Sequence, residues 1–215
     1  MLNITLIIII ITCIVSFTAF SKEKIINDLI FYPPAIANQN QWYRFITCGF
    51  IHADIAHLGF NMYSFYMFGG EVEEAFQSIF GVMGKAYYIL LYITSLIVCL
   101  LPTYFKNKDN YYYKSLGASG AVSAIVFTYI FIAPTAGIGL MFIPIPFPAI
   151  IFGVIYLGVS AYLSKRGGSN INHSAHFWGA IYGISFLIIT SYFFSKTFKA
   201  IPWFLQQLTD YFHRS

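Results

Sequence analysis

Five long uncharged stretches separate the charged residues of the chain, and these stretches outline its elements. No Asp, Glu, Lys or Arg occurs in residues 1–21, 55–70, 86–105, 115–164 and 167–195. A helix needs about 20 residues to cross a bilayer, so the fourth stretch is long enough for two helices. The pattern therefore predicts six helices, near residues 3–20, 56–75, 85–104, 117–133, 148–164 and 174–194.

The connection between the fourth and fifth predicted helices is rich in residues that break helices. It contains Pro134, Gly137, Gly139, Pro144, Pro146 and Pro148, a composition that favours turns. The apolar stretches themselves must be helical, because lipid leaves no other way to satisfy the backbone of segments this long. The expected fold class is an all-α polytopic membrane protein with a bundle of six transmembrane helices.

Two segments outside the six helices are predicted to lie at the membrane surface. Residues 21–55 are too long for a simple turn and too apolar for a solvated loop, so this first loop is expected to be partly interfacial. Residues 196–215 repeat apolar side chains at helical spacing, which predicts a short amphipathic helix. We therefore expect a membrane domain at 1–195 followed by an interfacial tail at 196–215.

The first predicted helix could be mistaken for a signal peptide that is cleaved off. It lacks a basic segment before it and an Ala-x-Ala cleavage site after it, so it is interpreted as a helix that the protein retains.

The composition agrees with lipid as the main solvent. Hydrophobic residues make up 58% of the chain and charged residues 9%, against about 25% charged residues in a typical soluble domain. This excludes a cytosolic enzyme, a disordered chain and a secreted module held together by disulfides. The basic residues are scattered, so no nucleic-acid partner is expected. Three widely spaced cysteines are interpreted as small buried hydrophobic residues: Cys13, Cys48 and Cys99.

Polar residues inside the second predicted helix are candidates for function, because ionisable groups are costly in a bilayer. His57 and Asn61 are four residues apart, so they share one face of a helix and can be directed at a common point. His52 lies off that face and nearer the interface. The alternative interpretation is that these groups only form hydrogen bonds with neighbouring helices.

The fourth predicted helix begins with the sequence Gly117-Ala118-Ser119-Gly120. Glycines on both sides of Ser119 let the backbone come close to whatever the hydroxyl contacts. Small residues also serve tight helix packing, so this motif alone is a weak signal.

The sixth predicted helix carries His176, with Gly179 and Gly183 one turn apart on nearly the same face. Glycines at this spacing favour close contact with another helix. Contact with the helix of Ser119 would bring hydroxyl and imidazole together. Acyl-transfer chemistry needs this arrangement, because a serine hydroxyl is inert until a base takes its proton.

A metal site is not expected. His173 and His176 are possible partial ligands, but no carboxylate occurs between 115 and 195 and the zinc-protease sequence His-Glu-x-x-His is absent. A Ser-His-Asp triad would need its carboxylate from elsewhere, and Glu71, Glu73 and Glu74 lie at the far end of the second helix from His57. A Ser-His dyad without metal or other cofactor is therefore the simpler reading.

Over about residues 42–183, the chain resembles the rhomboid intramembrane serine proteases. The motifs are Trp42-Tyr43-Arg44, His52 with His57-x-x-x-Asn61, Gly70-Glu71-Val72-Glu73, Gly117-Ala118-Ser119-Gly120 and Ala175-His176-x-x-Gly179-x-x-x-Gly183. They follow the order of the minimal six-helix bacterial form. The resemblance implies an endopeptidase in the bacterial inner membrane that cleaves single-span membrane proteins within the lipid bilayer.

The resemblance also implies roles for single residues. Ser119 would be the nucleophile and His176 its general base, while His57, Asn61 and the backbone N–H of Ser119 would bind the oxyanion. The remaining motif residues would be structural: Arg44, Glu73, Gly117, Gly120, Gly179 and Gly183. The chain departs from the family twice. Tyr43 separates Trp42 from Arg44, and Ser123 stands where some members place an aromatic ring that packs on the histidine, so other groups must orient His176.

Two other function classes stay open at this point. A catalytically inactive relative would bind membrane proteins, but Ser119 and His176 are both present. A small transporter would be expected to show inverted repeats, which the sequence lacks.

Orientation is a further point on which two arguments differ. The first, third and fifth loops hold eight basic residues and the opposite side four, which by the positive-inside rule would place those loops in the cytoplasm. The resemblance implies the reverse, with both termini in the cytoplasm, and we follow it.

Overall fold

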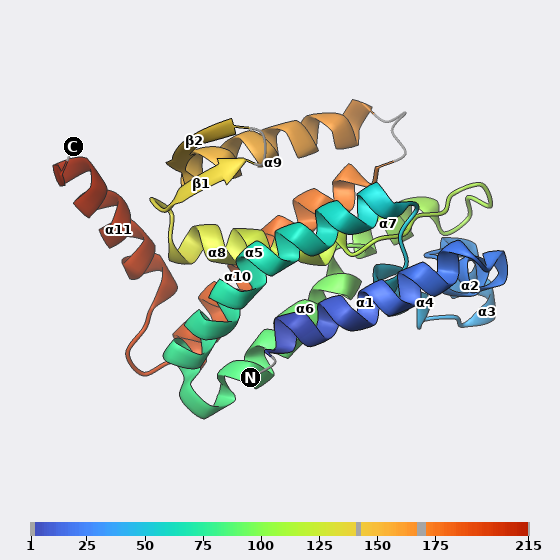
Figure 1. The fold of residues 1–215 in the computed structure, drawn as a ribbon, viewed down its shortest axis with the longest axis horizontal. Coiled ribbons are helices and arrows are strands. Elements are labelled where there is room, and N and C mark those ends of the chain that lie inside the picture. The colour runs from blue at the N-terminus through green and yellow to red at the C-terminus, as the bar shows by residue number, and fades with distance from the viewer. Residues whose placement is uncertain (1–2, 141–142, 167–170, 215) are drawn as a thin grey trace.

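The computed structural model describes residues 3–140, 143–166 and 171–214. Six main helices lie where the apolar stretches predict them, and Figure 1 shows their arrangement. They are α1 (Ile4–Phe20), α5 (Ile55–Phe80), α6 (Gly84–Val98), α8 (Ser119–Ile132), α9 (Ala149–Arg166) and α10 (His173–Phe194). The six predicted helices are thus present, but α5 extends beyond its expected end near residue 75 and α6 ends at Val98, before its expected end near residue 104.

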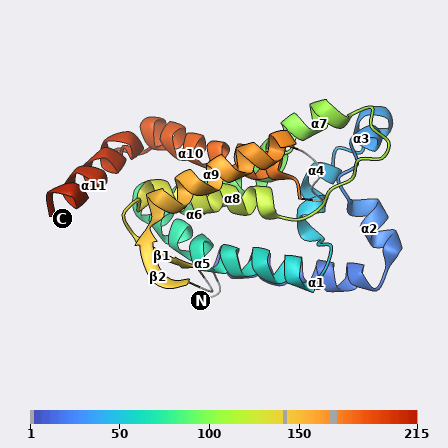
Figure 2. The same ribbon diagram turned by 90° about the horizontal axis from the view of Figure 1, so that it is seen from above.

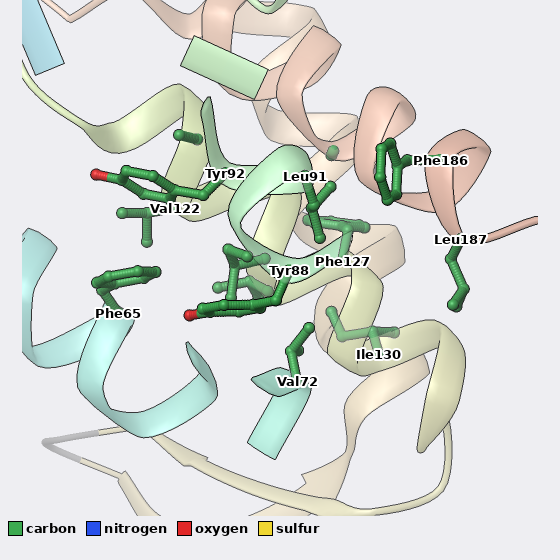
Figure 3. Close-up of a cluster of buried hydrophobic side chains, with 14 of the residues drawn as sticks. Phe65, Val72, Tyr88, Leu91, Tyr92, Val122, Phe127, Ile130, Phe186 and Leu187 are labelled. Atoms are coloured by element: carbon green, nitrogen blue, oxygen red, sulfur yellow. The ribbon is translucent and has the colours of Figure 1, made fainter. Parts of the chain in front are cut away.

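Helix α8 forms the centre of the bundle. Ten of its 14 residues are buried, so apolar side chains surround it on all sides rather than on one face. Figure 3 shows how side chains from α5, α6 and α10 meet those of α8 in this core. The labelled residues are Phe65 and Val72 of α5, Tyr88, Leu91 and Tyr92 of α6, Val122, Phe127 and Ile130 of α8, and Phe186 and Leu187 of α10.

Helices α8 and α10 pack closely because glycines line their contact. A Cβ added at Gly179 would overlap the carbonyl oxygen of Gly120, and one added at Gly183 would overlap that of Ala124. The expected contact between the helix of His176 and that of Ser119 is therefore present in the fold.

Three segments have the length and composition to cross a membrane: 55–107, which contains α5 and α6, then α9, then α10. Helices α1 and α8 are apolar but shorter, with 17 and 14 residues. At 1.5 Å per residue, α8 is about 21 Å long, less than the hydrocarbon core of about 30 Å. If α8 lies across the bilayer, at least one of its ends must therefore lie inside the hydrocarbon core.

The segment between α8 and α9 differs from the prediction of turns alone. It forms an antiparallel hairpin of β1 (Gly137–Leu140) and β2 (Ile143–Pro148), with Ile138 opposite Phe147. Prolines are compatible with β2 because a two-stranded hairpin leaves the outer edge of each strand without a partner, where a missing N–H breaks no ladder. The fold is thus a helical bundle with one small hairpin.

The first loop folds into short helical segments at one end of the bundle. They are α2 (Glu23–Leu29), α3 (Pro33–Gln39), α4 (Arg44–Thr47) and the 3₁₀ helix η1 (Cys48–Phe50). Helix α7 (Leu101–Asn107) lies at the same end, as Figures 1 and 2 show, whereas η2 (Gly81–Met83) joins α5 to α6 at the other. The buried Arg44 guanidinium donates to the carbonyl oxygens of Asn27 and Ile30, each at 2.8 Å. These bonds hold the loop together.

The tail forms the predicted amphipathic helix. Helix α11 (Ala200–Arg214) extends away from the bundle in both ribbon views. Its first turn is tied to α8, because the indole Nε1 of Trp203 donates to the carbonyl oxygen of Ile132 at 2.7 Å. Ile201, Leu205 and Phe212 are exposed along it, and a position at the membrane surface stays a prediction.

Candidate active site

The site is built around the turn that leads into α8. Gly117 has a φ of +111°, a conformation that residues with a side chain rarely adopt. A Cβ at this position would lie 2.7 Å from Cε1 of His57, so glycine is also required for space. The chain then enters α8, and Ser119 is the first residue of the helix.

The first loop holds this turn in place through main-chain bonds. Phe31 and Ser115 exchange two bonds, at 3.0 and 3.1 Å, and the N–H of Gly117 donates to the carbonyl oxygen of Cys48 at 2.9 Å. The loop that looked merely interfacial in the sequence is therefore a support for the residues just before Ser119.

His52 is the side-chain part of that support. The hydroxyl of Ser16 donates to the carbonyl oxygen of Phe50 at 2.9 Å, so Nδ1–H of His52 must be the donor in its 3.0 Å bond to Ser16. Nε2 is then free of a proton and accepts the N–H of Ala118 at 3.4 Å. Burial, together with nearby His57, lowers the pKa of His52 to about 3. The side chain of His52 is fully buried within the protein, and its position nearer the membrane interface than His57 stays a prediction.

Ser119 and His176 meet at the start of their two helices. The Oγ of Ser119 lies 2.7 Å from Nε2 of His176, a distance at which a hydroxyl donates to a neutral imidazole. The His176 ring has two aromatic neighbours, the edge-on ring of His173 at 5.8 Å and the stacked ring of Tyr156 at 6.2 Å. The close packing of α8 on α10 brings the two side chains together across 57 residues of sequence.

A cavity of about 240 Å³ lies beside this pair. His57 and Asn61 line it together with Ser119 and His176, and most of its remaining wall is apolar: Phe60, Phe68, Val122, Val126 and Phe152. A space of this kind accepts an apolar segment and brings its backbone against the hydroxyl.

Two potential donors of α5 line the same cavity. Nδ2 of Asn61 donates to the carbonyl oxygen of His57 at 2.9 Å, which uses one of its two protons. Nδ1 of His57 accepts the N–H of Ala53 at 3.5 Å, so the proton of the neutral ring is on Nε2. Donors are also available in the first turn of α8, because its N–H groups have no acceptor within the helix.

The structure thus brings together five of the residues selected from the sequence: Ser119, His176, His57, Asn61 and Gly117. It places Arg44 in the first loop, and Glu73 toward the far end of α5, where it caps α1. Within the described residues, no cluster of three or more His, Cys, Asp or Glu side chains could hold a metal ion.

The sequence did not indicate that Tyr156 contacts His176, or that His52 supports the turn before Ser119. Tyr156 is one aromatic residue among many in an apolar helix, so no spacing marked it. The only signal was indirect: the small Ser123 one turn after Ser119 left the His176 ring without a neighbour from α8.

Comparison with known proteins agrees with this site. The family model for the rhomboid domain matches residues 39–193. The chain belongs to the rhomboid family. That match contains His52, His57, Asn61, Ser119 and His176, and it identifies the chain as an integral, multi-pass membrane protein.

Individual relatives give the same result. The chain is 34% identical to the RHOMBOID-like protein 12, mitochondrial, of Arabidopsis thaliana over 63% of its length, and this match covers 42% of the relative. It is 30% identical to the putative rhomboid protease YdcA of Bacillus subtilis, with 74% of the chain and 72% of the relative covered. The chain is 27% identical to rhomboid protease GlpG of Haemophilus influenzae, with 79% of the chain and 80% of the relative covered. The chain thus spans about two fifths of the mitochondrial relative but most of the two bacterial ones.

Proposed function

We propose that this protein is an intramembrane serine endopeptidase that cleaves the transmembrane segments of membrane proteins. The observation that carries the proposal is the 2.7 Å contact between Ser119 Oγ and His176 Nε2 at the wall of an apolar cavity. Hydroxyl, base and apolar cavity together are what proteolysis of a lipid-embedded substrate requires.

In the first half of the reaction, His176 Nε2 takes the proton of Ser119 as Oγ attacks the scissile carbonyl carbon. The carbonyl oxygen becomes an oxyanion, and donors that line the cavity stabilise it: Nε2–H of His57, the second amide proton of Asn61 and the N–H of Ser119. The protonated His176 then gives its proton to the departing amine, which leaves an acyl ester on Ser119.

In the second half, water replaces the amine. His176 takes a proton from the water as its oxygen attacks the ester, and the proton returns to Ser119 when the ester bond breaks. The enzyme is regenerated with both groups in their starting state. None of these steps uses an Asp or Glu side chain, a metal or another cofactor.

The mostly apolar wall of the cavity beside Ser119 supports a membrane substrate. Ser119 is the first residue of a helix of 14 residues, too short to reach both faces of a bilayer. We assign single-span proteins as substrates. A single transmembrane segment is not packed against other helices of its own protein, so it can unwind locally and enter the cavity. The bacterial relatives and the minimal six-helix form favour the bacterial inner membrane as the location.

Replacement of either dyad member tests the proposal. Ser119→Ala and His176→Ala should each abolish cleavage of a model single-span substrate in detergent or proteoliposomes. The double variant should be little worse than either single one, because residues that act as a unit lose activity non-additively. Covalent labelling of Ser119 by a fluorophosphonate provides a readout that needs no substrate.

The same experiment separates the alternatives. An inactive membrane-protein binder would retain substrate capture but show no labelling of Ser119 and no cleavage in the unmodified protein. Full activity of His176→Ala would contradict the dyad.

A further inference from the structure

Helix α9 contributes an aromatic ring to the dyad. The ring of Tyr156 stacks on that of His176, with centroids 6.2 Å apart and planes 24° from parallel. Its own position is fixed on two more sides by Phe127, at 5.5 Å, and Phe152, at 5.8 Å. A stack of this geometry restrains the rotation of an imidazole about its side-chain bonds.

The hydroxyl of the same tyrosine connects to the other member of the dyad. Ser123 Oγ donates to the carbonyl oxygen of Ser119 at 2.8 Å, which uses its only proton. In the 2.8 Å bond between Tyr156 and Ser123, the phenol must then be the donor. A chain of two hydrogen bonds therefore runs from Tyr156 through Ser123 to the backbone of Ser119.

We infer that Tyr156 is a positioning residue for His176, an inference that rests on the proposed function. The ring sets the plane of the imidazole, and the phenol, fixed through Ser123, sets the ring relative to Ser119. One side chain thus holds the base and the nucleophile in register from a third helix.

The rest of α9 has few buried residues around this connection. Only Ala149, Gly153 and Ser160 are buried along its 18 residues, whereas α8 is buried on all sides. Apolar cavities of about 240 and 500 Å³ are both lined by Tyr156, Phe152 and His176. Because open space lies so close to the ring, the hydrogen bond to Ser123 adds a restraint to those from Phe127 and Phe152.

Tyr156→Leu tests the ring, with Tyr162→Leu as the matched control. Tyr162 is on the same helix and 62% exposed. The ring-free variant should lower kcat about tenfold, or about 1.4 kcal/mol, with KM almost unchanged, and should slow labelling of Ser119 to a similar degree. The control should leave kcat, KM and labelling unchanged.

Conservative variants test the hydroxyl and keep the proposal falsifiable if Tyr156→Leu folds poorly. Tyr156→Phe keeps the stack and should restore most of kcat. Tyr156→Phe and Ser123→Ala break the same hydrogen bond. The kcat of the double variant should therefore equal that of the less active single variant, and the two losses in kcat should not add.

A transplanted ring is the most specific arm of the test. Ser123 is one turn after Ser119 on α8, so Tyr156→Ala combined with Ser123→Tyr places an aromatic side chain next to His176 from the other side. This double variant should regain much of the kcat that Tyr156→Ala loses.

The inference and the proposed function fail in different ways. Absence of labelling and cleavage in the unmodified protein would overturn the proposed function. Normal, Ser119-dependent cleavage with the same kcat in Tyr156→Leu as in Tyr162→Leu would overturn the inference alone, and so would a change confined to KM.

Discussion

The amide of Asn61 carries two protons, and its bond to the carbonyl oxygen of His57 uses one of them within its own helix. That bond aligns the amide along α5 while its second N–H is available to the cavity. A side chain that is already held in place loses little freedom when an oxyanion forms beside it, which is why such donors stabilise a transition state more than a substrate.

Asn61→Ala is accordingly expected to be slow rather than inactive. The loss of one oxyanion donor typically lowers kcat by about 10² to 10³-fold, while Ser119, His176 and the α8 backbone are retained. Steady-state kinetics on a model substrate should show the change in kcat with KM nearly constant, and Ser119 should still be labelled, more slowly. Loss of the folded protein in detergent would instead make Asn61 a helix-packing residue.

His52 illustrates how a buried neutral histidine makes stability depend on pH. Its folded-state pKa is lowered to about 3, whereas an unperturbed histidine titrates near 6.5. Between these values the unfolded chain binds a proton that the folded chain does not, so stability falls as pH falls, by up to about 1.4 kcal/mol per pH unit.

A substitution that removes the titrating group should flatten this dependence. We expect the Tm of His52→Gln to be lower than that of the unmodified protein at pH 7 and the difference to shrink toward pH 4. Thermal unfolding in detergent across this range measures it, with the exposed His213→Gln as control. Parallel Tm curves for His52→Gln and the unmodified protein would show that His52 does not contribute.

At the scale of elements, the decisive contact is the one between α8 and α10. Ser119 and His176 are separated by a whole helix and a hairpin in the sequence, and only the approach of these two helices brings their side chains within 2.7 Å. That approach depends on backbone lying directly against backbone at Gly179 and Gly183. A methyl group at either position must push the helices apart.

Gly179→Ala and Gly183→Ala should therefore destabilise the fold by about 1–3 kcal/mol, the usual range for overpacking. Gly179→Ala, one turn from His176, should also reduce labelling of Ser119 in the fraction that remains folded. Gly158→Ala on α9 is the matched control, because an added Cβ there meets nothing within 4 Å. Equal Tm values for all three variants would show that the helices can adjust without loss.

At the scale of the whole molecule, a buried carboxylate ties the N-terminal end of α1 to α5. Glu73 accepts the N–H groups of Ile4 and Thr5 and the hydroxyl of Thr5, each at 3.0 Å. Thr5 in turn pairs with the Tyr88 hydroxyl at 2.7 Å. A negative charge at the start of a helix is favourable, since the unpaired N–H groups there carry partial positive charge.

Glu73→Gln should lower stability by about 1.5–3 kcal/mol, the range for hydrogen bonds to a charged group. Activity per labelled molecule should be retained, because Glu73 lies toward the far end of α5 from His57. Glu74→Gln, an exposed neighbour, provides the comparison. A loss of kcat in Glu73→Gln without a loss of Tm would contradict a purely structural role.

Much of this architecture could be predicted from the sequence by itself. A bilayer requires that long apolar segments be helical, so gaps between charges were enough to locate all six main helices. Polar groups are rare in such segments, which made Ser119, His176, His57 and Asn61 visible as candidates. The glycines at 179 and 183 indicated close packing because spacing alone places them on one face.

Tertiary structure decided what spacing cannot express. The stacking of Tyr156 on His176 joins two helices whose relative rotation no periodicity encodes, and the ring looks like any other in an apolar helix. The first loop pairs with Ser115 and Gly117 through backbone groups, which every sequence carries alike. Strands β1 and β2 pair with each other, although the prolines of this segment had favoured only turns. Local pattern thus determined which elements form, whereas contacts between distant segments determined how the site is held.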